Sequence, residues 1–227
     1  MTRRRVLLLL PVLAALSACS PGASSASPSP ASASAASSSA QPSSAQASPR
    51  PATATTPVSG ASTSSVQVGL LTEWFDTPLP SDQAQAAVVE DFRQGFLLYD
   101  KSQEKLALVA PVTSWVTGSA LTDLNKSLTA LSQEQLVPAG VDRLFRTRVT
   151  AVSGSGATIT TCDDASKYNE QDPRTHVVNP SSVNLPLSEE YIFITWGLTR
   201  ADGHWAINSI TIAPASSATS KSCLPSG

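Results

Sequence analysis

One long segment near the N-terminus limits where this chain can fold. From residue 20 to residue 65 the sequence is almost wholly Ser, Ala, Pro and Thr, with Arg50 as its only charge and Val58 as its only large aliphatic residue. Such a composition buries too little apolar surface to offset the entropy lost when a chain becomes ordered. We therefore predict a disordered tether over residues 19–65 and one folded domain over residues 66–227.

The tether follows a leader with the layout of an export signal. Arginines at residues 3–5 precede an apolar run over residues 6–15, which is too short to span a bilayer. The next four residues, Leu-Ser-Ala-Cys, resemble the lipobox of bacterial lipoproteins, whose cysteine receives a diacylglycerol and becomes the new N-terminus. The resemblance implies a signal peptide over residues 1–18, lipidation of Cys19 and anchoring to the outer face of the cytoplasmic membrane. An ordinary secretory signal with a chance cysteine is the alternative.

Cysteine usage agrees with export. Of the three cysteines, Cys19 would carry lipid, which leaves Cys162 and Cys223 as an even pair in an oxidising compartment. We predict a disulfide between these two residues, with two free thiols as the alternative. A metal site is disfavoured because no histidine cluster accompanies the pair, and a catalytic thiol would lack a neighbouring base. We expect no metal and no other cofactor.

Charge limits the choice of partners. Three of the 15 Lys and Arg lie in the leader and all 17 Asp and Glu follow it, so the mature chain would carry a net charge of −5. This balance disfavours nucleic acid. The expected partners are the membrane, through the lipid, and an unknown small apolar ligand, wall component or exported protein. One predicted strand carries Arg146 and Arg148, and Arg143 lies just before it. The simpler interpretation is a solvated sheet face, and the alternative is an anion-binding strip for a wall polymer.

Hydrophobic spacing divides the folded part into a helical half and an extended half. Apolar residues recur at helical spacing from Asp82 to Lys101 and again from Ser119 until Pro138, with short helical turns between the two helices. Beyond Gly140, runs rich in β-branched and aromatic residues indicate strands. Helices followed by strands predict an α+β fold in which the helices pack on one face of a strongly curved antiparallel sheet.

Two hairpins are expected within the extended half. The first spans residues 144–162 and turns at Gly-Ser-Gly, and the second spans residues 191–212 and turns at Asp202 and Gly203. An Asp-Gly pair between two strands favours a type I′ turn, whose two central residues both need positive φ. Residues 164–186 contain three prolines and little apolar content, so we predict a long loop there.

Four local patterns stand out in the folded part: Tyr99 near the end of the first helix, and the segments Val116–Leu121, Thr161–Ser166 and Arg200–Trp205. Together they resemble one family, the exported actinobacterial lipoproteins with a domain similar to nuclear transport factor 2 and ketosteroid isomerase. The resemblance covers about residues 68–223. It implies a cone-shaped, cystatin-like arrangement with a cavity at its open end, and it leaves a homodimer through the outer sheet face open.

Two classes of function stay open, because a fold of this kind hosts many activities. The first is a non-catalytic binding or interaction module, held at the cell surface by lipid. The second is an isomerase, cyclase or dehydratase in which acid and base groups inside an apolar cone move a proton. We favour binding, because no acidic residue, histidine or tyrosine of this chain aligns with an isomerase motif.

Three residues are weak catalytic candidates. Asp91 lies between apolar residues on the first helix and is the acid we expect to be most buried, although a solvated helix charge is the simpler interpretation. Asp164 follows a predicted strand end, where an Asx turn is the simpler interpretation. His176 lies in the predicted long loop, from which it could reach the mouth of the cone.

Aromatic residues supply the candidates for a pocket or a partner contact. Most aromatic side chains of a domain this small are needed to fill its core. Trp74 and Phe75 directly follow the tether and are harder to explain as core residues, so they could form a lid or a partner contact. Tyr99 and Trp115 are candidates for lining a pocket.

Overall fold

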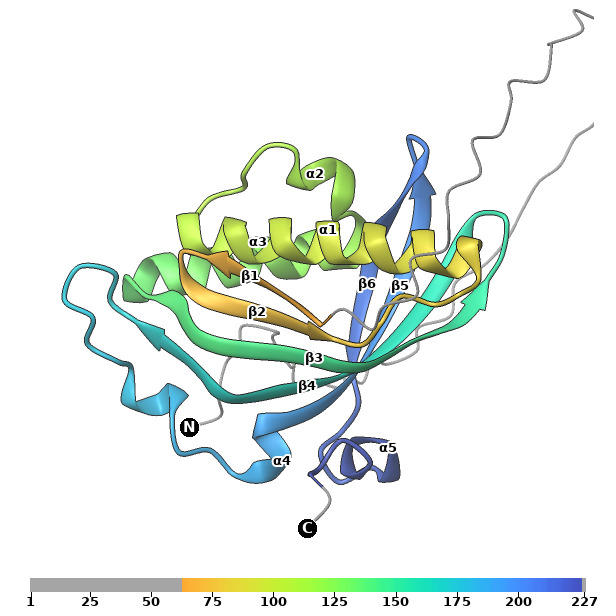
Figure 1. The fold of residues 1–227 in the computed structure, drawn as a ribbon. Coiled ribbons are helices and arrows are strands. Elements are labelled where there is room, and N and C mark those ends of the chain that lie inside the picture. Colours follow the sequence, from red (N-terminus) through yellow and green to blue (C-terminus); the bar gives the residue numbers. More distant parts are fainter. Residues whose placement is uncertain (1–62, 226–227) are drawn as a thin grey trace, which may run out of the picture. The chain divides into compact units, whose positions relative to one another are not determined.

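The computed structural model describes residues 63–225; the leader, Cys19 and most of the predicted tether lie outside the described residues. The described part contains a six-stranded sheet and five α-helices (Figure 1). In chain order the elements are β1 (Ser64–Val68), β2 (Leu70–Asp76), α1 (Gln83–Lys105), α2 (Val112–Trp115), α3 (Gly118–Glu134), β3 (Val137–Val152), β4 (Gly156–Gln171), the 3-10 helix η1 (Pro180–Ser182), α4 (Leu187–Glu190), β5 (Tyr191–Ala201), β6 (His204–Ile212) and α5 (Ala218–Lys221).

The strands lie in the sheet in their sequence order, from β1 to β6, and the sheet is not closed. Neighbouring strands are antiparallel except for β2 and β3, which are parallel. A parallel pair needs a crossover connection, and here the chain runs through α1, α2 and α3 between the two strands. The structure thus confirms the α+β class and corrects the expectation of a wholly antiparallel sheet.

Helices α1, α2 and α3 lie on one face of the sheet, and α4 and α5 lie on the other (Figure 1). The helical spacing of α1 places Val88, Phe92 and Phe96 on one side, where all three are buried. Phe92 and Phe96 pack on Trp196 of β5, with ring centroids 5.0 and 5.5 Å apart. The main core therefore lies between α1, α3 and the inner face of the sheet, which we define as the face toward these helices.

The second predicted hairpin is confirmed. Strands β5 and β6 pair antiparallel on either side of Asp202 and Gly203, which have φ values of 46° and 89°. Both turn residues thus adopt the positive φ that the Asp-Gly sequence predicts. The first hairpin is also present, but its strands extend further than expected, from Val137 to Gln171.

The predicted loop over residues 164–186 is wrong in its first third, because β4 continues to Gln171. A bulge explains why the sequence hides this strand: residues 141 and 143 of β3 pair with residues 167 and 164 of β4, so β4 carries one extra residue. The extra residue shifts the alternation, and both Ala165 and Tyr168 become buried.

A second correction concerns the segment after the tether. Strand β1 begins at Ser64, two residues before the predicted domain boundary, and pairs with β2 in a hairpin that was not predicted from the sequence. Leu71, Glu73 and Phe75 of β2 are buried, whereas Trp74 is 39% exposed. Because side chains alternate along a strand, Trp74 points to the outer face of the sheet, away from α1.

The backbones of β3 and β4 approach closely at Gly140 of β3, and a substitution there tests how closely they pack. It has a φ of 87°, and a Cβ atom there would lie well inside van der Waals contact of the Lys167 carbonyl oxygen. We expect Gly140→Ala to lower the free energy of unfolding by about 3 kcal/mol, from backbone strain and overpacking together. The control is Gly203→Ala, which shares the positive φ but has open space around the Cβ position, so we expect only about 1 kcal/mol. Equal losses in urea unfolding would contradict the tight pairing.

Candidate functional site

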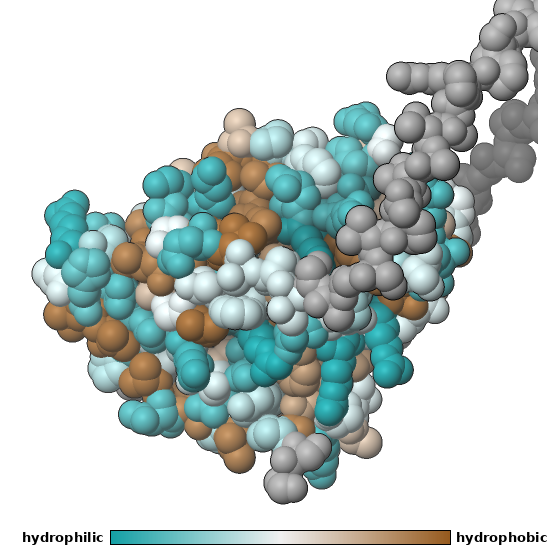
Figure 2. Space-filling model, viewed as in Figure 1, coloured by the Kyte–Doolittle hydropathy of each residue, from teal (hydrophilic) through white to brown (hydrophobic). Residues whose placement is uncertain are grey.

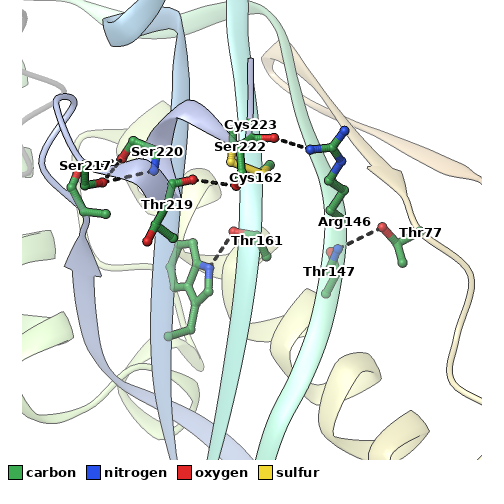
Figure 3. The surroundings of a disulfide bond; sticks show 12 residues. Thr77, Arg146, Thr147, Thr161, Cys162, Ser217, Thr219, Ser220, Ser222 and Cys223 are labelled. Carbon is green, nitrogen blue, oxygen red and sulfur yellow. Dashed lines mark hydrogen bonds between the residues drawn. A yellow bond between two sulfur atoms is a disulfide. The ribbon is translucent and has the colours of Figure 1, made fainter. Parts of the chain in front are cut away.

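The predicted cysteine pair is at bonding distance. The sulfur atoms of Cys162 and Cys223 are 1.96 Å apart, across a sequence separation of 61 residues. Thr161, the neighbour of Cys162, is buried and accepts a hydrogen bond of 2.9 Å from the indole of the core residue Trp196, so Cys162 points to the outer face. The disulfide therefore attaches the end of the chain to the outer face of the sheet (Figure 3).

The segment 214–225, which we call the C-terminal strap, has further contacts. Arg146 of β3 donates a hydrogen bond to the carbonyl oxygen of Ser222 (Figure 3). The hydroxyl of Ser220 donates to the carbonyl oxygen of Ala213 at 3.2 Å, and the backbone N–H of Ser220 donates to the hydroxyl of Ser217 at 3.0 Å. The strap thus occupies part of the outer face.

An open groove of about 530 Å³ lies over β2, β3 and β4. Three of its residues occupy one row across these strands, because Trp74 is the register partner of Arg143 and Arg143 is the register partner of Asp164. We call this the outer groove. Its lining consists of Trp74, Asp76, Val141, Arg143, Asp164, Ser166 and Lys167.

Polar groups of the outer groove are held in place by contacts with each other. Arg143 forms an ion pair with Asp76, and its guanidinium lies 5.6 Å from the ring centroid of Phe145. One carboxylate oxygen of Asp164 accepts hydrogen bonds from the backbone N–H and the hydroxyl of Ser166, at 3.1 and 2.7 Å. The groove therefore presents an exposed indole beside charged groups, of which Arg143, Asp76 and Asp164 have contacts with other side chains.

Phe145 links the outer groove to the strap. The guanidinium of Arg146 lies 5.6 Å from its ring centroid, as does that of Arg143. A cation near an aromatic ring is attracted by the ring electrons. Arg146 also donates a hydrogen bond to Ser222 of the strap. Two of the three arginines that the sequence suggested as an anion-binding strip, Arg143 and Arg146, therefore contact other groups of the protein.

A second, interior cavity lies between the helices and the inner face of the sheet. Its volume is about 30 Å³, whereas pockets for small organic ligands have about 300 to 1,000 Å³. A space of this size holds one or two water molecules. Its lining contains both apolar and polar residues, namely Phe96, Tyr99, Asp100, Gln103, Ser127, Leu131, Asp142, Tyr168, Glu170, Trp196 and Ile210.

The interior cavity is lined by three buried carboxylic acids that were not predicted from the sequence. Asp100, Asp142 and Glu170 are 6%, 2% and 7% exposed. Asp100 follows Tyr99 on α1, Asp142 is in a strand among arginines, and Glu170 lies in the segment predicted to be a loop. The alternation Leu71-Thr72-Glu73-Trp74-Phe75 could have revealed a fourth buried acid, Glu73, because it shares a face with Leu71 and Phe75.

None of the three weak catalytic candidates lines the interior cavity. Asp91 is half-buried, and its carboxylate accepts a hydrogen bond of 2.8 Å from the backbone N–H of Trp205. Asp164 lies in β4 and lines the outer groove. Asp91 thus has a structural contact with the start of β6, and Asp164 belongs to a different site from the one expected.

The contact of Asp91 predicts a selective effect of substitution. Asp91→Ala removes the acceptor for a buried N–H, so we expect the free energy of unfolding to fall by about 1 to 2 kcal/mol. Asp91→Asn keeps a carbonyl oxygen at this position, and we expect a change within about 0.5 kcal/mol. Chemical unfolding of the three proteins measures both effects. An asparagine variant as unstable as the alanine variant would show that the negative charge itself is required.

His176 lies on an exposed turn beyond β4. The carboxylate of Asp172 accepts hydrogen bonds from the backbone N–H groups of Thr175 and Arg174, at 2.9 and 2.7 Å. These bonds favour the ionised carboxylate and lower the pKa of Asp172. His176 has a φ of 58°, and its ring lies 3.3 Å from the side-chain amide of Gln171.

The aromatic candidates have four different environments. Trp74 is exposed in the outer groove. Phe75 is buried and packs edge-on against Phe96 at 6.1 Å, so it belongs to the core. Tyr99 is buried and lines the interior cavity. Trp115 is half-buried and stacks on the ring of His204 with centroids 4.1 Å apart, and His204 contacts the Ser114 carbonyl oxygen at 2.9 Å.

The surface of the domain mixes polar and apolar residues. On the face drawn in Figure 2, hydrophobic and hydrophilic residues are interspersed over the helices and the neighbouring strands. Among residues 63–225 no helix combines the length and the apolar character needed to cross a membrane. Within the same range, no group of three or more His, Cys, Asp and Glu side chains is arranged to hold a metal ion.

The chain was compared with protein families, curated proteins and solved structures. No protein-family description matches the chain, and no curated protein matches it. Among solved structures, the intermembrane space region of the chloroplast protein ARC6 is similar over 59% of this chain and 98% of its own length, with 16% sequence identity and a TM-score of 0.36.

Proposed function

We propose that this chain is a lipid-anchored binding module on the outer side of a bacterial cytoplasmic membrane, and that the outer groove is its binding surface. The observation that carries the proposal is the exposed Trp74 in an open groove of about 530 Å³. Tryptophan is enriched at interfaces because it combines a large apolar ring with an N–H donor, and here it lies beside charged and polar side chains in one groove. The interior cavity, at about 30 Å³, offers no comparable room.

Sequence features support the location. The leader with its lipobox-like Cys19 supplies the anchor, and the Ser/Ala/Pro/Thr segment supplies a tether long enough to separate the domain from the membrane. The disulfide between Cys162 and Cys223 suits an oxidising compartment. We also propose the nuclear transport factor 2-like class for the domain, on the basis of the local sequence resemblance and the helices packed on one sheet face.

The position of the strap limits how two copies of the domain could form a dimer. A homodimer through the outer sheet face would have to form around residues 214–225 and would cover the same face as the groove. We therefore propose that the groove serves a ligand rather than a second copy of the chain.

A second candidate is an acid-base enzyme at the interior cavity. The observation in its favour is the gathering of Asp100, Asp142 and Glu170 with two tyrosines around one cavity, because paired acids and hydroxyls are the groups that move protons in isomerases. Such an enzyme would need the cavity to widen before a substrate could enter.

Retention on cell walls tests the proposed binding function. The full-length chain carrying Cys19→Ser, which lacks the lipid site, is mixed with walls from the organism that encodes it and then centrifuged. We expect the protein to sediment with the walls, and Trp74→Ala to weaken retention at least about tenfold, as for a central aromatic contact. The control is Leu79→Ala, because Leu79 is also 39% exposed but lies outside the groove. No retention, or equal retention of both variants, would contradict the proposal.

A further inference from the structure

We infer that the outer groove binds a neutral, polyhydroxylated saccharide chain, an inference that rests on the proposed binding function. Three properties of the groove support this inference. Its charges balance, its indole lies beside hydrogen-bond donors and acceptors, and its lining consists of few residues.

Charge balance argues against a strongly anionic polymer. The lining contains two basic residues, Arg143 and Lys167, and two acidic residues, Asp76 and Asp164. Arg143 is neutralised by its ion pair with Asp76. Recognition of a polyphosphate chain depends on an excess of positive charge along the site, and this groove has none. A neutral ligand brings no net charge that the groove would have to balance.

The arrangement of polar groups fits hydroxyls. A sugar ring has an apolar face of C–H groups, which can pack on the indole of Trp74, and a rim of hydroxyls that both donate and accept hydrogen bonds. Arg143 and Lys167 supply donors, and Asp76 and Asp164 supply acceptors. The hydroxyl of Ser166 donates its proton to Asp164, so its oxygen supplies a further acceptor. Several of these groups are already held by the Asp76 ion pair and the Asp164 hydrogen bonds, so little side-chain entropy is lost on binding.

The dimensions of the site favour a narrow chain over a folded protein. A standard protein interface uses about 20 to 30 residues on each side. The groove is lined by seven residues, and the strap takes up a neighbouring part of the same face through Arg146 and the disulfide. A saccharide chain lying across β2, β3 and β4 needs only this row of side chains.

Competition for wall retention tests the inference. Walls of the encoding organism are separated into a neutral soluble saccharide fraction, an anionic polymer fraction and a protein fraction. Each is added to the full-length Cys19→Ser chain with intact walls, at 50 and 500 mM NaCl. We expect the neutral saccharide fraction alone to compete, with its midpoint changed less than about twofold by salt, because uncharged groups are not screened. Trp74→Phe, which keeps an aromatic face, should be retained on the walls more strongly than Trp74→Ala, and Leu79→Ala should be retained as the parent is.

The outcomes separate the two proposals. If the walls retain the protein through Trp74 but only the anionic fraction or only the protein fraction competes, the groove binds another class of partner and the saccharide inference is wrong. Retention that depends on Trp74 and that no fraction reduces would also overturn it. If the walls do not retain the protein at all, the proposed binding function fails first.

Discussion

Replacing Cys223 with alanine is expected to lower the free energy of unfolding by about 4 kcal/mol. The disulfide joins residues separated by 61 positions, and closing a loop of this length removes conformational entropy from the unfolded chain by about that amount. Loss of the bond also releases the strap from β4. Urea unfolding of the oxidised parent and of the variant measures the difference.

The matched control is Ser222→Ala, beside the bond. Ser222 is exposed, and its hydroxyl donates only to the carbonyl oxygen of Thr219, at 2.6 Å. Its substitution should change the free energy of unfolding by no more than about 0.5 kcal/mol. A parent protein whose urea midpoint is the same with and without a reducing agent would show that the disulfide contributes nothing to stability.

Phe92→Ala is expected to have an effect of similar size. The Phe92 side chain is fully buried, and its ring lies 5.0 Å from that of Trp196 and 5.9 Å from that of Phe96. Removing a buried phenylalanine ring costs about 3 to 5 kcal/mol, from lost burial and from the cavity left behind. Calorimetric or urea unfolding should therefore place this variant far below the parent.

A neighbouring residue on the same helix provides the comparison. Gln94 of α1 is exposed, so Gln94→Ala should leave the free energy of unfolding within about 0.5 kcal/mol of the parent. Phe92→Leu should fall between the two. If Phe92→Ala unfolds within 1 kcal/mol of Gln94→Ala, on the scale of about 3 to 5 kcal/mol expected for a core ring, then the ring cluster is not the centre of the core.

Elements with a strong local signal could be predicted from the sequence. The spacing of apolar residues gave α1 and α3, because one face of each helix is buried against the sheet. The Asp-Gly turn between β5 and β6 is a local requirement for positive φ, and both residues have it. The cysteine pair was predictable by counting, because only two cysteines remain after Cys19.

Elements that depend on distant partners could not be predicted in this way. Strands β1 and β2 adjoin a tether-like composition, and β2 pairs with β3 only after three intervening helices. The bulge in β4 interrupts the alternation by which a strand is normally recognised. Both features depend on the register of pairing, which the local sequence does not contain.

The candidate site shows the same division. Trp74 stood out in the sequence as an aromatic residue without an obvious place in the core. Its neighbours Arg143 and Asp164 come from strands far along the chain, and only the register of β2, β3 and β4 brings them into one row. The buried acids Asp100 and Glu170 were missed because their burial depends on packing against other elements rather than on local spacing.

Mapping of the binding surface by NMR tests the central claim most directly. Backbone and indole N–H resonances of the isotope-labelled full-length Cys19→Ser chain are followed while soluble wall fragments are added. Binding at the outer groove predicts the largest shifts at Trp74, Arg143 and Lys167, with little change at Tyr99 and Tyr168. Shifts concentrated at the two tyrosines, with Trp74 unchanged, would contradict the account and place the site in the interior cavity.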